Sequence, residues 1–224
     1  MALITPDDLA TAVAEELSQG QPPLPTATGQ PLSGPPTATS ASALIDRRHI
    51  RDVLTQRSSA RDYASTPLRE HTLTELLDLA TAVHVRHWPR GLYAGGQLRV
   101  EVAALRVGHL RPGLYGWASQ DSGLVLRTVP SWLAVLGARY CAAPSIVLIS
   151  GPTVAALPHS YRPARVESGA LGYAIWLSAR TAGLEAVSFG GASNEHTREL
   201  PTGMRHLFTL ALGHPWEAGT ASQA

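Results

Sequence analysis

The sequence predicts an α+β fold, because helical patterns stand before and after a central group of strand patterns. Turn signals at Pro112-Gly113 and at Asp121-Ser122-Gly123 lead into two of these strands, and the second is typical of a hairpin. The length of 224 residues suits one globular domain with appendages, or at most two small domains. We find no internal repeat, so a repeat architecture is not expected.

The first 43 residues differ in pattern from the rest of the chain. Residues 1–18 contain a predicted helix over 5–18, in which Pro6 suits the first helical position and Asp7 and Asp8 suit the positive end of the helix dipole. Residues 19–43 are rich in Pro, Ser and Thr, and predict an extended linker or a wrapping arm. The main domain is therefore expected over 44–219, followed by a tail over 220–224.

Hydrophobic periodicity and turn residues divide the main domain into elements. Thr72 and Glu75 form a candidate capping box for the second helix, and Gly183 follows the long helix. Residues 84–96 and 158–165 read as irregular or loop segments. Helices are predicted over 45–56, 71–83, 131–140, 165–182 and 194–200. Strands are predicted over 98–107, 124–129, 144–150, 186–189 and 206–212, with another short strand entered at Leu110–Tyr115.

The composition narrows the classes of function. The 18 basic and 17 acidic residues nearly balance, so the chain lacks the charge expected of a nucleic-acid-binding protein. Every basic residue is Arg, which excludes a lysine Schiff base, a lysine general base and a P-loop lysine. Cys141 is the single cysteine, so no intrachain disulfide or cysteine zinc site is expected, and a cytoplasmic location is the plain interpretation. No secretory signal and no membrane-spanning run is evident.

The segment Arg57-Ser58-Ser59-Ala60-Arg61 is the first candidate binding site. Arg grips a phosphate with a fork of donors, and Ser adds a donor of adjustable direction. A compact anion site just before a turn is what a phosphate-bearing cofactor requires. Taken alone, the same segment is more typical of a solvated surface turn with two charges.

Two glycine-rich segments and a histidine complete the candidate binding set. Gly190 and Gly191 follow a predicted strand, where backbone N–H groups can approach a flat ligand closely because no Cβ intervenes. Ala94, Gly95 and Gly96 form a second small and flexible segment. His214 follows the last predicted strand and could reach an anion. The alternatives are a strand-to-helix turn, an ordinary loop and a solvated histidine.

Tyr161 is the candidate catalytic residue. Its phenol stands beside Arg162, and a nearby positive charge lowers a phenol pKa enough to favour proton transfer. The alternative is a surface loop. His84 and His87 could share a helix face, but no third ligand stands at a metal-site spacing, so no metal is expected.

The order of these motifs resembles the nitroreductase-like FMN flavoprotein superfamily, and is most similar to its SagB-type azoline dehydrogenases. The similarity covers roughly residues 45–216. The segments that carry it are RSSARDY with TPLREHTLTELLDLA, YAGGQLRVEV, RVGHLRPGLYGWASQDSGLVL, ESGALGYAIWLSARTAGLEAVSFGG and LFTLALGHP. The sequence departs from the family where Arg-Gly-Leu-Tyr replaces a Pro-Ser opening, where Gly172-Tyr173 replaces a Gln-Asn pair, and where the Lys of a Lys-Tyr pair is missing.

The resemblance implies a nitroreductase-like α+β fold with a central, mostly antiparallel sheet surrounded by helices. It implies a homodimer with FMN in each interface cleft, where Arg57, Ser58, Ser59 and Arg61 hold the phosphate and the ring edge. Gly190 and Gly191 would offer backbone donors near flavin N5. The partner subunit would contribute Ala94, Gly95 and Gly96, and His214 would meet the phosphate.

The activity implied is FMN-dependent oxidation of azoline to azole on a modified peptide, within natural-product (RiPP) biosynthesis. Tyr161 would be the base, and oxygen would reoxidise the flavin. One alternative is an NAD(P)H-dependent reductase of a quinone, nitro compound or dehydroamino acid. Another is a flavin-poor scaffold or partner subunit of a peptide-modifying complex, for which residues 1–43 could serve as a docking tether. The sequence leaves open the substrate and the redox partner.

Overall fold

The computed structural model describes residues 54–55, 59–87, 98–118, 123–156, 158–189 and 193–216. The chain divides into two units, Met1–Ala43 and Leu44–Ala224, and every described residue belongs to the second. The predicted helix over 5–18, the linker over 19–43 and the tail over 220–224 therefore lie outside the described residues. Of the helix predicted over 45–56, only Leu54 and Thr55 are described, and both are helical.

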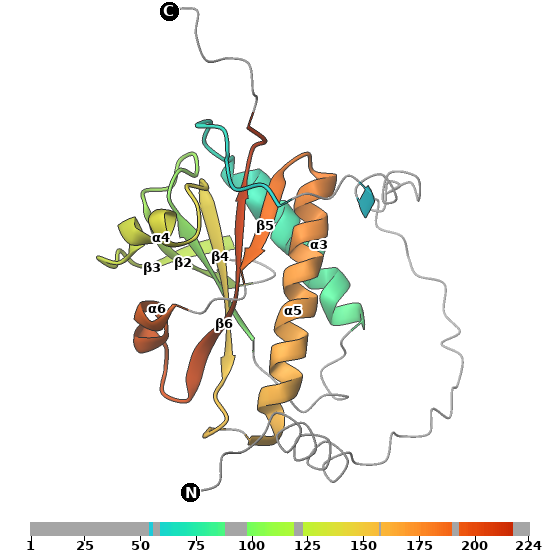
Figure 1. The fold of residues 1–224 in the computed structure, drawn as a ribbon, viewed down its shortest axis with the longest axis vertical. Helices are drawn as coiled ribbons and strands as arrows, with labels where there is room; N and C mark the ends of the chain where they lie inside the picture. Colours follow the sequence, from blue (N-terminus) through green and yellow to red (C-terminus); the bar gives the residue numbers. More distant parts are fainter. Residues whose placement is uncertain are drawn as a thin grey trace, which may run out of the picture. The chain divides into compact units, whose positions relative to one another are not determined.

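The centre of the fold is a six-stranded sheet of order β3-β2-β1-β4-β6-β5, in which every neighbouring pair is antiparallel (Figure 1). The strands are β1 (Arg99–Ala104), β2 (Gly113–Ala118), β3 (Gly123–Thr128), β4 (Ser145–Pro152), β5 (Glu185–Phe189) and β6 (Met204–Gly213). The α+β fold with a central antiparallel sheet is thus confirmed. Helices cover both faces of the sheet, with α3 (Glu70–His87) and α5 (Pro158–Thr181) on one side, and α4 (Leu133–Arg139) and α6 (Asn194–Glu199) on the other.

Strand β4 shows why the sheet needs covering on both faces. Its residues are buried along the whole strand. Val147 and Ile149 pack in the core under α3 and α5, whereas Ile146 and Leu148 pack in the core with α4. A strand buried on both faces reads as a continuous apolar run, and each such side chain contributes roughly 1.5–3 kcal/mol when fully buried. The alternation of one strand therefore builds both cores.

Helix α5 ends where the sequence predicts. Gly183 has φ of 75°, a left-handed conformation that favours glycine. Its N–H donates to the carbonyl of Arg180, and the N–H of Leu184 donates to the carbonyl of Ala179. These two bonds form a Schellman motif, which satisfies carbonyls that the helix end leaves free.

Three predicted boundaries are wrong. Helix α3 begins at Glu70, so Thr72 and Glu75 lie inside the helix and do not form a capping box. The same helix continues to His87, past the predicted end at 83. Helix α5 begins at Pro158, so the predicted loop over 158–165 is helical and contains Pro163. Pro158 occupies a first helical position, and Ala164 next to Pro163 is fully buried, so packing holds this turn despite one lost backbone bond.

Candidate functional site

The end of β6 lies beside the segment that contains Ser59 and Arg61. Tyr63 and Pro215 form an antiparallel bridge, and the N–H of Ala64 donates to the carbonyl of His214 over 3.1 Å. The Tyr63 hydroxyl donates to the carbonyl of Ala211 over 3.2 Å. The structure therefore brings two of the predicted anion-binding segments together.

Tyr63 anchors this arrangement while leaving its neighbours available to a ligand. Its side chain is buried beside Cys141, and burial raises the pKa of both the phenol and the thiol. Ser59 and Arg61 are exposed, and His214 is half-buried. An exposed guanidinium and hydroxyl on an anchored segment are suited to hold a phosphate.

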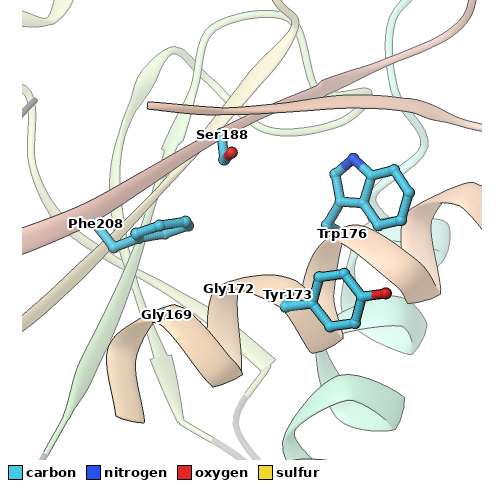
Figure 2. Close-up of a pocket in the computed structure, with 6 residues that line it drawn as sticks. All are labelled: Gly169, Gly172, Tyr173, Trp176, Ser188 and Phe208. Atoms are coloured by element: carbon cyan, nitrogen blue, oxygen red, sulfur yellow. The ribbon is translucent and has the colours of Figure 1, made fainter. Parts of the chain in front are cut away.

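A pocket of about 250 Å³ lies between α5 and the β5–β6 edge of the sheet (Figure 2). Its wall combines three aromatic side chains, two helical glycines and one hydroxyl: Gly169, Gly172, Tyr173, Trp176, Ser188 and Phe208. Figure 2 shows Phe208 and Trp176 on opposite sides, Ser188 above and the two glycines on the helix below. Apolar walls with few polar groups are typical of sites for small ligands and cofactors.

The two glycines shape this pocket in different ways. A Cβ on Gly172 would lie 2.4 Å from Cε1 of Phe208, so only glycine lets the phenyl ring pack against the helix here. A Cβ on Gly169 would meet no atom within 4 Å, so that glycine borders open space. The aromatic wall is fixed on the other side, because the Trp176 indole N–H donates to the carbonyl of Ala186 over 3.1 Å. Tyr173 stacks on Trp176 with ring centroids 5.8 Å apart.

Strand β5 connects the pocket to the anion-binding segments. At its start, Glu185 pairs with Gly213, the residue before His214. Ser188, three residues on and roughly 10 Å away at the usual rise of a strand, lines the pocket. Two residues beyond Ser188 the chain reaches Gly190 and Gly191. The start of β5 therefore lies by the anion-binding segments, and its end lies by the aromatic pocket. A short flexible chain can span the roughly 10 Å between them.

Tyr161 lies apart from this pocket. It is in the first turns of α5, where its hydroxyl is 3.4 Å from Nη1 of Arg165 and the same guanidinium lies 5.9 Å from its ring centroid. Gly169 follows eight residues later, which is about 12 Å along a helix. The structure does not bring Tyr161 to the residues that line the pocket.

A buried polar cluster under α6 escaped the sequence analysis. Glu101 Oε2 and Ser150 Oγ each lie 3.3 Å from Nε2 of His196, and Arg99 donates to Glu101 Oε1 over 2.7 Å. Burial raises the pKa of Glu101 and lowers the pKa of His196 to about 3, so it disfavours both charged forms. The His206 ring lies 5.3 Å from that of His196, edge to face. Only the helix and strand pairing, which no local pattern reveals, brings these residues together.

This cluster is not a hydrolase triad. In such a triad the serine and the carboxylate bind different nitrogens of the histidine. Here both lie against Nε2, and each of these side chains is almost fully buried.

The described residues hold no group of three metal-ligating side chains. Within the same residues, no helix has the length and apolar character needed to cross a membrane.

Several predicted site residues lie outside the described residues. They are Arg57, Ser58, Ala94, Gly95, Gly96, Gly190 and Gly191. Ser59, Arg61, Tyr161 and His214 are placed as given above. Sequence reasoning missed the pocket side chains Trp176, Ser188 and Phe208, because glycine, serine and aromatic residues in helices and strands carry no binding signature of their own.

No protein-family model and no curated protein matches the sequence, so solved structures provide the comparison. A structure described as a nitroreductase from Ralstonia eutropha matches 75% of this chain and 83% of its own, with a TM-score of 0.58 and 18% identity. One from Anabaena variabilis, also described as a nitroreductase, matches 75% of this chain with a TM-score of 0.61 and 18% identity, and this chain spans 38% of that protein.

A chain of the E. coli microcin synthetase McbBCD complex, solved with truncated pro-MccB17 bound, also has this fold. It matches 96% of each chain with a TM-score of 0.53 and 14% identity. At such low identities the similarity concerns architecture. The six-stranded antiparallel sheet and its surrounding helices therefore form a nitroreductase-like α+β fold.

Proposed function

We propose that this chain is an FMN-dependent oxidoreductase whose flavin ring occupies the pocket between α5 and β5. The observation that carries the proposal is the pocket itself, which has aromatic walls and a glycine floor and lies one short strand away from the Arg61 and His214 segments. A flat ring needs close approach and apolar walls, and a phosphate needs Arg and Ser donors. FMN carries a flat ring at one end and a phosphate at the other, so it requires both kinds of site.

The residues fit the cofactor in the following way. Arg57, Ser58, Ser59, Arg61 and His214 would hold the phosphate, and Gly190 and Gly191 would offer backbone donors to the ring. Ser188 would add a hydroxyl at the ring edge, and Trp176 and Phe208 would exclude water from the ring. Ala94, Gly95 and Gly96 of a second copy would close the site in a homodimer. FMN, when bound, supplies hydride transfer, and the chain supplies position and electrostatics.

For the substrate we propose a modified peptide bearing an azoline ring. The support is the sequence resemblance to azoline dehydrogenases and the fold shared with a chain of a synthetase complex that binds pro-MccB17. Tyr161 would take the proton beside the ring heteroatom, and Arg165 lies against its phenol. Tyr161 lies eight residues before the pocket residue Gly169 on α5, so Tyr161→Phe tests this role directly.

The visible spectrum of the purified full chain tests cofactor binding. We expect flavin absorbance near one equivalent per chain, and a colourless protein when Arg57→Ala and Arg61→Ala are combined. Arg86→Ala is the matched control, because Arg86 is exposed on α3 and outside the site. The wild type should also prefer FMN to riboflavin, and the double variant should lose that preference. A colourless wild type that cannot be reconstituted with FMN contradicts the proposal and favours a flavin-free scaffold.

A reductase of the same fold is the second candidate, since two structural neighbours are described as nitroreductases. Anaerobic mixing with NADH or NADPH separates the two. Rapid bleaching of the flavin by a nicotinamide donor favours the reductase. Slow bleaching by both donors, together with flavin reduction by an azoline peptide, favours the dehydrogenase.

A further inference from the structure

His206 on β6 bonds to Phe208, which lines the pocket of the proposed flavin site, and to Ser193, which follows the Gly190-Gly191 pair in the sequence. Its Nδ1 accepts from the N–H of Ser193 over 2.8 Å, and its Nε2 lies 2.9 Å from the carbonyl of Phe208. Phe208 forms one wall of the pocket, and Ser193 follows Gly190 and Gly191 at the entry to α6. One buried imidazole therefore connects the pocket wall to the chain that leaves the glycine pair.

These contacts require one form of the imidazole. A backbone N–H can only donate, so Nδ1 must carry no proton. A carbonyl can only accept, so Nε2 must carry the proton. Thr209 Oγ1, 3.0 Å from Nε2, is compatible with the same form because a hydroxyl oxygen can also accept. The neutral Nε2–H tautomer is therefore the single form that satisfies every contact.

Several hydrogen bonds hold Ser193, and two of them connect it to His206 directly or through Thr197. The Thr197 hydroxyl donates to the Ser193 carbonyl over 2.8 Å and accepts from the N–H of His206 over 3.2 Å. The N–H of His196 donates to the Ser193 hydroxyl over 3.2 Å. The Ser193 side chain thus caps α6, while His206 fixes the backbone just before the helix.

The surroundings keep His206 neutral. Burial, the largest cause, and the charges of Arg139 and Arg205 together lower its pKa to about 4, against the hydrogen bond to the carbonyl of Phe208, which raises it. The neighbouring ring, His196, is itself neutral by burial, and it separates His206 from the carboxyl of Glu101.

We propose that His206 is a positioning residue for the flavin ring, holding the Phe208 wall and the Ser193 backbone at a fixed separation. The proposal rests on the proposed function, because it assigns the ring to this pocket. His206 itself does not touch the ring. Its role is to fix the pocket wall at Phe208 relative to the backbone at Ser193.

Three substitutions separate its two contacts. His206→Asn keeps an acceptor near Nδ1 for Ser193, and His206→Gln keeps a donor near Nε2 for Phe208. His206→Phe loses both. His206→Phe leaves the buried N–H of Ser193 without a partner, which destabilises the backbone there. We therefore expect His206→Phe to raise the Kd for FMN about tenfold or more. The Kd values of His206→Asn and His206→Gln should lie between those of His206→Phe and the wild type. The flavin absorbance maximum should shift in the same order.

The control is a variant with a similar loss of thermal stability and no contact with the site. Leu77→Ala on α3 serves, because Leu77 is fully buried, is not among the residues that line the pocket, and large-to-small changes in a core destabilise. Leu77→Ala should leave the FMN Kd and the absorbance maximum at wild-type values. If His206→Phe also leaves both unchanged, or if the control shifts them equally, His206 is structural only and the proposal is overturned.

Amide hydrogen exchange without flavin decides the case in which wild type binds no FMN. The amides of Ser193 and of the neighbouring residues should exchange faster in His206→Phe than in Leu77→Ala, with His206→Asn restoring the protection of Ser193. That result supports the positioning role even where the cofactor assignment fails. Equal exchange in the two variants overturns it.

Discussion

Two alanine substitutions on one helix should change stability in opposite directions. Gly169 and Gly172 lie three residues apart on α5, and both line the pocket. Replacing a helical glycine with alanine stabilises by roughly 0.5–1 kcal/mol where space allows, because the unfolded chain loses freedom. A Cβ at Gly169 meets nothing within 4 Å, so Gly169→Ala should gain that amount.

Gly172→Ala carries an additional cost. The new Cβ would lie 2.4 Å from Cε1 and 2.6 Å from Cδ1 of Phe208, whereas carbon atoms in contact are normally about 3.5–4.0 Å apart. The phenyl ring must therefore move by about 1 Å or more, which costs roughly 1–3 kcal/mol. Because the helix gain is common to both variants, Gly172→Ala should be less stable than Gly169→Ala by about 1–3 kcal/mol. In this size of domain, that is a difference of several degrees in Tm.

Urea unfolding of both variants, followed by tryptophan fluorescence, measures this difference. Phe208→Leu combined with Gly172→Ala should recover much of the loss, since the contact that causes it is gone. Gly172→Ala should also raise the Kd for FMN, because it displaces the phenyl ring of Phe208, which forms one wall of the pocket. Equal stability of the two alanine variants, or no coupling between positions 172 and 208, would refute the reasoning.

Two further predictions concern the histidines and the proposed base. His206 and His196, with pKa values lowered to about 4 and about 3, stay neutral in the folded chain while the unfolded chain protonates them below about 6.5. The stability that these neutral histidines contribute should therefore be fully present above pH 6.5 and fall as pH drops toward 4, by about 3 kcal/mol for His206. The free energy of unfolding from urea titrations should depend less on pH over that range in His206→Asn than in His71→Asn, a control at an exposed histidine. The raised pKa of Glu101 acts in the opposite sense and offsets part of this loss. Tyr161→Phe should keep wild-type FMN binding and lose turnover of an azoline peptide, measured by flavin reduction; unchanged turnover removes Tyr161 from the mechanism.

The sequence predicted the elements of this fold because their signals are local. The alternation in Leu98–Val107 and the apolar run before Ser150 each report burial on a strand, and Gly183 reports a helix end. The start of α5 was missed because two prolines read as loop signals. Pro158 in fact suits the first helical turn, and the buried Ala164 overrides the cost of Pro163. Propensity is a local quantity, and here tertiary packing decided the boundary.

The same distinction between local signals and tertiary packing explains which residues of the candidate site could be predicted from sequence. The Arg61 segment could be proposed from sequence because Arg and Ser chemistry is recognisable in a short stretch. The cluster of Glu101, His196 and His206 could not, because these residues stand on β1, α6 and β6 and meet only through the order of the strands. The pocket wall was equally hidden, because its residues come from α5, β5 and β6, and no local pattern shows how the helix packs against those strands.

Gly172-Tyr173, where the sequence departs from the Gln-Asn pair of the family it resembles, acquires a physical meaning in the structure. Gly172 leaves the space that the ring of Phe208 occupies, and Tyr173 stacks on Trp176 at the opposite wall. A larger side chain at 172 would collide with Phe208, so the change at 172 and the aromatic residue at 208 depend on each other. The departure therefore replaces polar helix side chains with an aromatic-walled pocket. In the proposed site the flavin ring would be held by apolar contact more than by side-chain amides, which predicts that the Kd for FMN responds more strongly to Phe208→Ala than to Ser188→Ala.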